Sequence, residues 1–350
     1  MIPRALGKLL DGQHLTTEEA GQVMTHIMQG GATQAQIGAL LGSLRTKKET
    51  TDELVGFATA MREHAIKVTP RKRPLLDTCG TGGDGGKTFN ISTCAAFVIA
   101  ASGIAIAKHG NRGVSSNCGS ADVLAALGVD LSLSPEAIAK CIDKVGIGFM
   151  YAPTHHPATG YAAQARKEMG VRTAFNLLGP LVNPAGATRQ LVGVFDPDMC
   201  EKVAETLGRL GCERAMVVHG MDGLDEISTI GPTRIAHLQQ GRVSIETRIP
   251  AEFFVVPSNI EDIKGGDTAD ENADIIVNIL QGEAGPKRDI VCVNAAAGLI
   301  LGGMAEGWRD GLNLAYRLID SKKAINVLQK LVDFTTDPEN SAQQAAAQQQ

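Results

Sequence analysis

The fold is decided by residues 75–93, LLDTCGTGGDGGKTFNIST. The stretch begins with a short apolar run, continues through five glycines and ends in hydroxyl and amide side chains. That order is typical of a strand, a tight turn and the first turn of a helix. Backbone N–H groups at such a junction, together with the helix dipole, bind anions. The stretch therefore predicts an α/β fold with an anion-binding loop.

Beyond this stretch, short apolar runs alternate with helical segments. We expect strands at residues 75–79, 104–108, 147–152, 191–195 and 215–219, and a β-hairpin at residues 234–250. Strands that alternate with helices favour a mostly parallel central sheet flanked by helices. Ser134 before Pro135, and Asp196 before Pro197, each place a capping residue ahead of a proline, which predicts the start of a helix at both places.

The residues before the glycine-rich stretch are helical in character. Thr16, Thr33 and Thr50 each precede a Glu or Gln by three positions, which is the capping-box pattern of a helix start. A basic stretch with two prolines at residues 70–74 then marks a domain boundary. This part of the chain predicts a small all-helical N-terminal domain.

The domain organisation follows from these patterns. We expect a helical domain over residues 1–70, joined by part of residues 164–184, and a larger α/β domain over residues 75–335. The tail, residues 341–350, is rich in Gln and Ala, which predicts disorder.

Composition limits the possible partners and compartments. The chain has 350 residues, a formal net charge of −5 and a pI near 5.9, so its overall charge attracts neither nucleic acid nor anionic membranes. The longest near-apolar run, residues 94–107, is too short to span a bilayer. Seven cysteines without a CxxC pair predict reduced thiols and a cytoplasmic location. We therefore expect no membrane and no nucleic acid as partners.

The glycine-rich loop matches two known phosphate-binding patterns imperfectly. Glycines 80, 82 and 85 fit the dinucleotide fingerprint G-x-G-x-x-G, yet no acid occurs between Gly85 and Ala121 to hold a ribose. An NADP-type site that uses Lys108 or Arg112 stays open as an alternative. The Walker pattern fails because its first glycine would fall at Thr81.

Three further clusters follow later strands. Residues 108–122 combine three potentially cationic side chains with glycines, hydroxyls and amides, which suits a phosphate cradle. Because the carboxyl ends of parallel strands share one edge of the sheet, this cluster and the glycine loop would face one crevice. Asp225 and Glu226 suit Mg²⁺ bound together with substrate phosphates. His155 and His156 precede Arg166, and an arginine there could take a substrate carboxylate.

These motifs together resemble the anthranilate phosphoribosyltransferase family. The matching segments are GTGGD at residues 80–84, TFNIST at 88–93, KHGNR at 108–112, HHPA at 155–158 and RTAFNLLGPLVNP at 172–184. The segment before Arg166, Tyr161 to Ala165, departs from the Pro-Val that is commoner there. The resemblance implies transfer of the 5-phosphoribosyl group from 5-phosphoribosyl 1-diphosphate to the amino group of anthranilate, in tryptophan biosynthesis, with Mg²⁺ as cofactor and a homodimer formed through the helical domains.

The resemblance also assigns roles to residues of this chain. It implies that Arg166 and Asn111 meet anthranilate, that Ser92 and Glu226 hold one Mg²⁺, and that Asp225 and Glu226 hold a second. Lys108, Ser92, Asp225, Glu226 and Arg166 would be the catalytic residues. The substrate-binding residues would be Gly80, Gly83, Asp84, Thr88, Asn90, Ile91, Ser92, Thr93, Lys108, His109, Gly110, Asn111, Arg112, Gly113, Val114, Ser115, Ser116, Ser120, His156 and Arg166.

The chemistry of this reaction suggests which groups matter most. Displacement of pyrophosphate passes through a cationic sugar, so neutralising the leaving group with Mg²⁺ and Lys108 helps most, whereas the arylamine is uncharged at neutral pH and the histidines at most assist orientation. Two other readings stay open beside the NADP-type enzyme. They are a pyrimidine nucleoside phosphorylase, which shares single motifs, and a non-catalytic nucleic-acid-binding paralogue.

Overall fold

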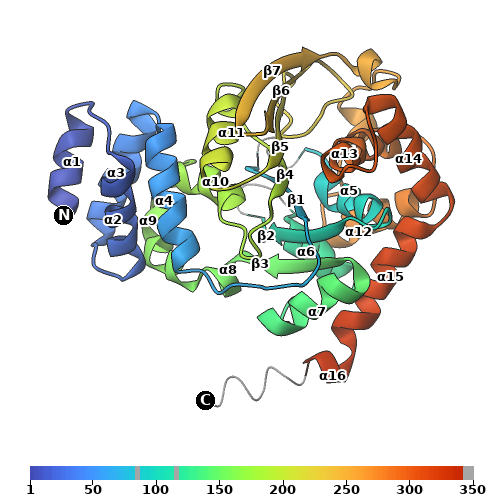
Figure 1. Cartoon of the computed structure of the whole chain (residues 1–350), viewed down its shortest axis with the longest axis horizontal. Helices are drawn as coiled ribbons and strands as arrows, with labels where there is room; N and C mark the ends of the chain where they lie inside the picture. Colours follow the sequence, from blue (N-terminus) through green and yellow to red (C-terminus); the bar gives the residue numbers. More distant parts are fainter. Residues whose placement is uncertain (83–86, 114–117, 342–350) are drawn as a thin grey trace.

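The computed structural model describes residues 1–82, 87–113 and 118–341. It consists of a helical bundle beside a larger α/β domain (Figure 1). The bundle contains α1 (Ile2–Leu10), α2 (Thr17–Met28), α3 (Gln34–Lys47) and α4 (Thr51–Glu63). The expected capping boxes are confirmed, because the side chains of Thr16, Thr33 and Thr50 each accept a backbone N–H at the start of α2, α3 and α4.

A seven-stranded sheet with the order β3-β2-β1-β4-β5-β6-β7 forms the centre of the α/β domain. The strands are β1 (Leu75–Gly80), β2 (Ala105–Gly110), β3 (Ile147–Tyr151), β4 (Arg189–Gly193), β5 (Arg214–Gly220), β6 (Thr233–Gln239) and β7 (Arg242–Arg248). β1 to β5 pair in parallel, and β6 and β7 add an antiparallel hairpin at one edge. The expected strands, hairpin and α/β fold class are therefore confirmed.

Helices cover both faces of this sheet. They are α5 (Ile91–Ala100), α6 (Ser120–Ala126), α7 (Pro135–Val145), α11 (Met199–Arg209), α12 (Ala269–Leu280), α13 (Pro286–Gly302), α14 (Trp308–Asp320), α15 (Lys323–Thr336) and the short α16 (Pro338–Ser341), with 3₁₀ turns at Pro250–Phe253 and Glu261–Ile263. Side chains alternate along each strand. Leu76 and Val218 face the core formed with α5 and α13, while Leu75 faces α7 and Val217 faces α11.

Residues 152–181 return from the sheet to the bundle (Figure 1). They form α8 (Ala152–His155), a 3₁₀ turn (Pro157–Ala162), α9 (Ala163–Met169), α10 (Ala174–Leu178) and a second 3₁₀ turn (Gly179–Leu181). The amide of Gln34 in α3 accepts a hydrogen bond from the backbone N–H of Ala165 and donates one to the carbonyl of Tyr161. One apolar core therefore includes the bundle, this segment and the α11 face of the sheet.

Two expectations about helix ends and the tail have different outcomes. Ser134 caps α7 as expected. The expectation for Asp196 is wrong, because α11 begins at Met199 and the Asp196 carboxylate instead accepts the backbone N–H of Asp198 in a turn before the helix. Ser341 is the last residue of α16, and residues 342–350 of the tail lie outside the described residues.

Two further features of the described chain are the state of its cysteines and the character of its helices. All seven cysteines are free thiols. Within the described ranges, we find no helix with the length and apolar character needed to cross a bilayer.

Candidate active site

A cavity of about 340 Å³ opens at the carboxyl edge of the parallel strands. Its walls come from the segments that follow β1, β2, β3 and β5, together with α9, α10 and the 3₁₀ turn after α10. The sheet order changes direction at β1, with β2 on one side and β4 on the other, and such a switch point is where open α/β sheets bind ligands. The fold therefore brings the glycine-rich loop and the later clusters to one crevice, as expected.

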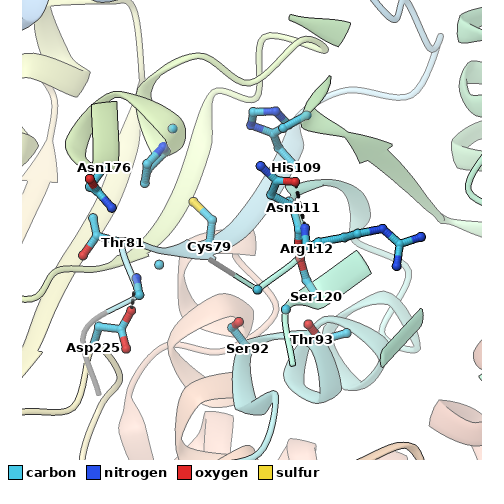
Figure 2. A pocket seen from close by; sticks show the side chains of 18 of the residues that line it. Cys79, Thr81, Ser92, Thr93, His109, Asn111, Arg112, Ser120, Asn176 and Asp225 are labelled. Carbon is cyan, nitrogen blue, oxygen red and sulfur yellow. Dashed lines mark hydrogen bonds between the residues drawn. The ribbon is translucent and has the colours of Figure 1, made fainter. Parts of the chain in front are cut away.

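The N-terminus of α5 forms one wall of this cavity (Figure 2). Asn90 donates from its side-chain amide to the carbonyl of Cys118, 3.1 Å away. Its own Oδ1 and the hydroxyl of Thr93 are buried and have no hydrogen-bond partner among the described residues. Buried polar atoms are seldom left unpaired, so these two atoms mark positions that suit a polar ligand. The helix dipole at this end favours an anion.

Asp225 and Glu226 lie between the glycine loop and α5. Oδ2 of Asp225 accepts the backbone N–H of Gly82 at 2.9 Å (Figure 2), and Oε1 of Glu226 accepts the backbone N–H of Ser92 at 3.1 Å. Both side chains are half-buried and line the cavity. Two carboxylates beside a helix N-terminus that favours anions provide the hard oxygen ligands that Mg²⁺ prefers, so the donor set fits this ion.

Two glycines make room for the Asp225 loop. A Cβ on Gly80 would lie 2.5 Å from Oδ2 of Asp225, and a Cβ on Gly193 would lie 1.6 Å from its backbone carbonyl oxygen. Gly193 ends β4, and the sequence analysis did not single it out. A glycine that closes an apolar strand is the signal that could have identified it, since such glycines mark close backbone approach.

Lys108 lines the cavity and is almost completely buried. Its ammonium donates to the carbonyl oxygen of Thr78 at 2.5 Å, and burial lowers its pKa, although the nearby Asp77 carboxyl opposes that shift. The ammonium therefore lies under the strand that leads into the glycine loop. The expected contact between Lys108 and a leaving group stays a prediction.

Asp122 organises the described part of the cluster at residues 108–122. The Asp122 carboxylate accepts the backbone N–H groups of Gly113 and Gly119 at 2.8 and 2.9 Å, and it pairs with Arg112 at 2.8 Å. A Cβ on Gly119 would lie 2.3 Å from the backbone nitrogen of Gly113, so the two ends of this loop approach each other closely. Asp122 thereby sets the geometry of a loop whose central residues, 114–117, lie outside the described residues.

Three histidines lie under the site. His109 and His156 are buried with ring centroids 5.2 Å apart, and within the part of the chain that the structure describes their Nε2 atoms have no hydrogen-bond partner. Burial lowers the pKa of His109 to about 3 and that of His156 to about 4, and it also lowers the pKa of His155. These imidazoles are therefore uncharged at neutral pH, which suits orientation better than acid catalysis.

Asp77, a buried acid in β1, contacts the segment that carries His109. The Asp77 carboxylate accepts the backbone N–H of His109 and the side-chain amide of Asn183, and burial raises the pKa of Asp77 to about 6. Neither Asp77 nor Asn183 was predicted as a site residue. Asp77 lies at a strand position that otherwise reads as core, so the pattern gave no signal for it.

Arg166, in α9, faces the cavity from the side opposite the sheet. Its guanidinium lies 4.9 Å from the centroid of the Phe175 ring and is half-buried, and burial lowers its pKa. No ion pair among the described residues involves Arg166. Such a guanidinium suits a planar carboxylate ligand with a neighbouring aromatic ring.

Arg172 connects the same segment to the glycine loop. Its guanidinium donates to the carbonyl of Gly82 at 3.0 Å and lies over the ring of Phe195 at 4.9 Å. The sequence analysis noted this arginine but did not place it in the site.

All the predicted site residues that the structure describes line this one cavity. They are Gly80, Thr88, Asn90, Ile91, Ser92, Thr93, Lys108, His109, Gly110, Asn111, Arg112, Gly113, Ser120, His156, Arg166, Asp225 and Glu226. The predicted residues Gly83, Asp84, Val114, Ser115 and Ser116 lie outside the described residues. Cavity residues that the sequence analysis did not predict include Thr81, Thr159, Phe175 and Asn176.

The fold and the site together define a glycosyltransferase with a helical bundle and an α/β domain. Residues 72–325 match the α/β domain of the glycosyl transferase family, and residues 3–65 match the helical bundle domain of that family. An anthranilate phosphoribosyltransferase of Moorella thermoacetica is 52% identical over 332 residues, which cover 95% of this chain and 98% of the relative. The chain belongs to the anthranilate phosphoribosyltransferase family, as the sequence motifs indicated.

Solved structures agree with this assignment. The anthranilate phosphoribosyltransferase of Thermus thermophilus has a TM-score of 0.89 at 42% identity, covering 95% of this chain and 99% of that one. The enzyme of Saccharomyces cerevisiae, in complex with PRPP and Mg, has a TM-score of 0.87 at 27% identity, covering 96% and 98%. The same yeast enzyme in complex with 4-fluoroanthranilate has a TM-score of 0.86 at 25% identity, covering 96% and 97%.

Proposed function

We propose that this cavity transfers the 5-phosphoribosyl group of 5-phosphoribosyl 1-diphosphate to the amino group of anthranilate, giving N-(5-phosphoribosyl)anthranilate and diphosphate. One observation carries this proposal. The Arg166 guanidinium, which suits a carboxylate, lines the same cavity as the α5 N-terminus and the Asp225–Glu226 pair, which suit a phosphorylated donor and its metal. Neither a nucleoside phosphorylase nor a nicotinamide-dependent enzyme needs this combination.

The donor would lie along the carboxyl edge of the sheet. The backbone at the start of α5 and the hydroxyl of Thr93 would hold its phosphates, and the buried Oδ1 of Asn90, which can only accept, would take a hydrogen bond from a ribose hydroxyl. The residues proposed to contact it are Gly80, Gly83, Asp84, Thr88, residues 90–93, residues 108–116 and Ser120. Arg112, already paired with Asp122, would add positive charge at the outer end of the loop.

Magnesium ions would be held by the carboxylates beside α5. We propose two ions, one held by Ser92 and Glu226 and a second by Asp225 and Glu226. The structure of the yeast enzyme with PRPP and Mg supports the choice of metal. Bound Mg²⁺ would neutralise negative charge on the departing diphosphate. In the structure Glu226 already accepts the backbone N–H of Ser92, so these two residues lie within reach of a shared ligand.

The acceptor would lie against Arg166, whose guanidinium would take the anthranilate carboxylate while Asn111 lines the same cavity. The amine lone pair attacks C1 of the ribose, the bond from C1 to the diphosphate oxygen breaks with its electron pair leaving on diphosphate, and the amine loses a proton to water. Because the buried histidines are uncharged, we infer that holding the two substrates in line supplies most of the rate enhancement, with Lys108 adding positive charge below the site.

Assembly and location also belong to the proposal. We propose that the chain forms a homodimer through its helical domain, where Leu10 of α1 is 73% exposed. Light scattering of the purified chain tests it. The cytoplasmic location stays a prediction.

The test of the reaction is the loss of anthranilate fluorescence on mixing the protein with anthranilate, 5-phosphoribosyl 1-diphosphate and Mg²⁺. We expect a decay that EDTA abolishes and that Arg166→Ala weakens mainly through the KM for anthranilate. A folded protein that binds the donor but shows no decay would reject anthranilate as the acceptor.

A further inference from the structure

A buried asparagine of α13 contacts the loop that carries the two carboxylates. Asn294 has no exposed surface, and it lies in the middle of a helix that otherwise buries apolar side chains. Its Oδ1 accepts the backbone N–H of Ile227 at 2.9 Å, and its Nδ2 donates to the Ile227 carbonyl at 3.0 Å. The same Nδ2 donates to the carbonyl of Ile290, one helical turn earlier, at 2.9 Å. One side chain therefore binds both peptide groups of Ile227, the residue that follows Glu226.

We propose that Asn294 is a positioning residue for the metal site, because it fixes the backbone from which Glu226 and Asp225 project. This inference rests on the proposed function, in which those two carboxylates hold Mg²⁺. Asn294 does not line the cavity, so it acts only through the loop.

The residue type at this position favours that role over simple core filling. Asparagine is less favourable than leucine or alanine in a helix interior, and a buried amide is costly unless its hydrogen bonds are made. Asn294 is flanked in α13 by buried valine and alanine, and its amide satisfies a donor and an acceptor that no apolar side chain could satisfy. Without it, the N–H and carbonyl of the buried Ile227 would lose these partners.

A second anchor holds the loop on the other side of the carboxylates. Asp222 accepts the backbone N–H of Leu224 at 3.2 Å and also accepts from the hydroxyl of Ser228. The loop is thus held at residues 224 and 228 by its own aspartate and at residue 227 by α13. Asp225 and Glu226 lie between these points, and their carboxylates already reach Gly82 and Ser92. The backbone between the two anchors is therefore fixed before any ligand binds.

The test compares Asn294→Leu, which keeps the branched shape and the number of side-chain heavy atoms but removes the amide, with Leu301→Ala. Leu301 is a buried residue of the same helix, seven residues and about two turns later, and it makes no contact with the loop through hydrogen bonds. For Asn294→Leu we expect at least a tenfold rise in the Mg²⁺ concentration that half-saturates activity at fixed donor, with a smaller change in kcat at saturating Mg²⁺. Leu301→Ala should lower the melting temperature and leave that Mg²⁺ concentration unchanged.

Two measurements without turnover accompany the assay. Binding of Mn²⁺ to the protein with donor present, followed by electron paramagnetic resonance, should weaken at least tenfold in Asn294→Leu. In the metal-free protein, amide hydrogen exchange of the peptide containing residues 221–231 should speed up in Asn294→Leu and not in Leu301→Ala. If Asn294→Leu does not fold, Asn294→Ser takes its place, because a serine hydroxyl can bond back to the Ile290 carbonyl but is too short to replace the amide at Ile227.

The outcomes separate this inference from the proposed function. The positioning role is refuted, and the metal site stands, if two results occur together. The asparagine variant keeps its half-saturating Mg²⁺ concentration and its exchange rate within twofold of the parent values, and Glu226→Gln raises the half-saturating Mg²⁺ concentration. If Glu226→Gln keeps normal Mg²⁺ dependence, the metal assignment itself is wrong. Loss of Mn²⁺ affinity together with faster exchange in the asparagine variant supports the positioning role.

Discussion

The buried, uncharged His109 and His156 make the stability of this protein sensitive to mild acid. His109 and His156 are at most 6% exposed, and burial lowers the pKa of His109 from 6.5 to about 3 and that of His156 to about 4. Because these folded-state values lie below the unfolded value, the unfolded chain binds more protons in between. The contribution of these two histidines to the free energy of unfolding is therefore fully present above pH 6.5, and it falls as the pH drops toward 4.

The size of the effect follows from linkage. Between pH 7.0 and 5.5, each histidine removes about 1.25 kcal/mol from the free energy of unfolding. Asp77 opposes this, because its folded-state pKa of about 6 lies above the unfolded value of 3.8, so it returns about 0.8 kcal/mol over the same interval. The net loss is about 1.7 kcal/mol. His155, whose pKa is also lowered, acts in the same direction as the other two histidines.

Urea unfolding followed by far-UV circular dichroism at the two pH values measures this loss. His156→Leu removes one titrating ring, so its net loss should shrink to about 0.5 kcal/mol. An equal loss in the variant and the parent chain, or a stability that does not change between pH 7.0 and 5.5, would show that these imidazoles are solvated or charged in the folded protein.

Four substitutions test other parts of the site. Arg166→Ala should raise the KM for anthranilate about 30-fold, which corresponds to about 2 kcal/mol for a charge-assisted contact, with a smaller change in kcat; steady-state fluorescence assays decide it, and an unchanged KM would remove Arg166 from the acceptor site. Glu226→Gln should lower kcat more than His109→Ala or His156→Ala does, because the carboxylate acts on developing charge whereas the rings are uncharged; a larger loss at His109 would reverse this ranking. Gly193→Ala should lower the free energy of unfolding by about 1–3 kcal/mol, because its Cβ would overlap the Asp225 carbonyl, and urea unfolding measures this change. Gly186→Ala serves as the control for backbone strain alone, since a Cβ there meets nothing within 4 Å although φ is +63°. Asp122→Asn should raise the KM for 5-phosphoribosyl 1-diphosphate with little change in the KM for anthranilate, since it weakens the hydrogen bonds that hold the donor-loop ends; equal changes in both would contradict this role.

Local chemistry made much of the molecule predictable. The capping boxes at Thr16, Thr33 and Thr50 act within one helical turn, so sequence alone identifies them. The glycine-rich loop and the 108–113 segment each follow their own strand, and parallel pairing then brings the strand ends to one edge. For this reason the residues that line this side of the cavity were predictable individually.

Contacts between distant segments were not predictable in the same way. The approach of Gly193 to Asp225 exists only when β4 lies beside the loop after β5, so the glycine at the end of the strand could indicate a close contact but not its partner. Asp77 and Asn294 occupy positions with the periodicity of core residues, so their polar contacts become visible only in the folded structure. Asp196 failed for a local reason, because an Asp-Pro pair can equally well form the turn before a helix.

The shared apolar core has a consequence for how this chain is made. Residues of the bundle pack with Ala162, Ala165 and Leu178, and with the α11 face of the sheet, so the first four helices cannot complete their own core. A ribosome releases these helices first and must still add residues 66–238 before that core is filled. During this interval apolar side chains such as Phe57 stay accessible to chaperones, and the newborn bundle depends on protection that the finished protein does not need.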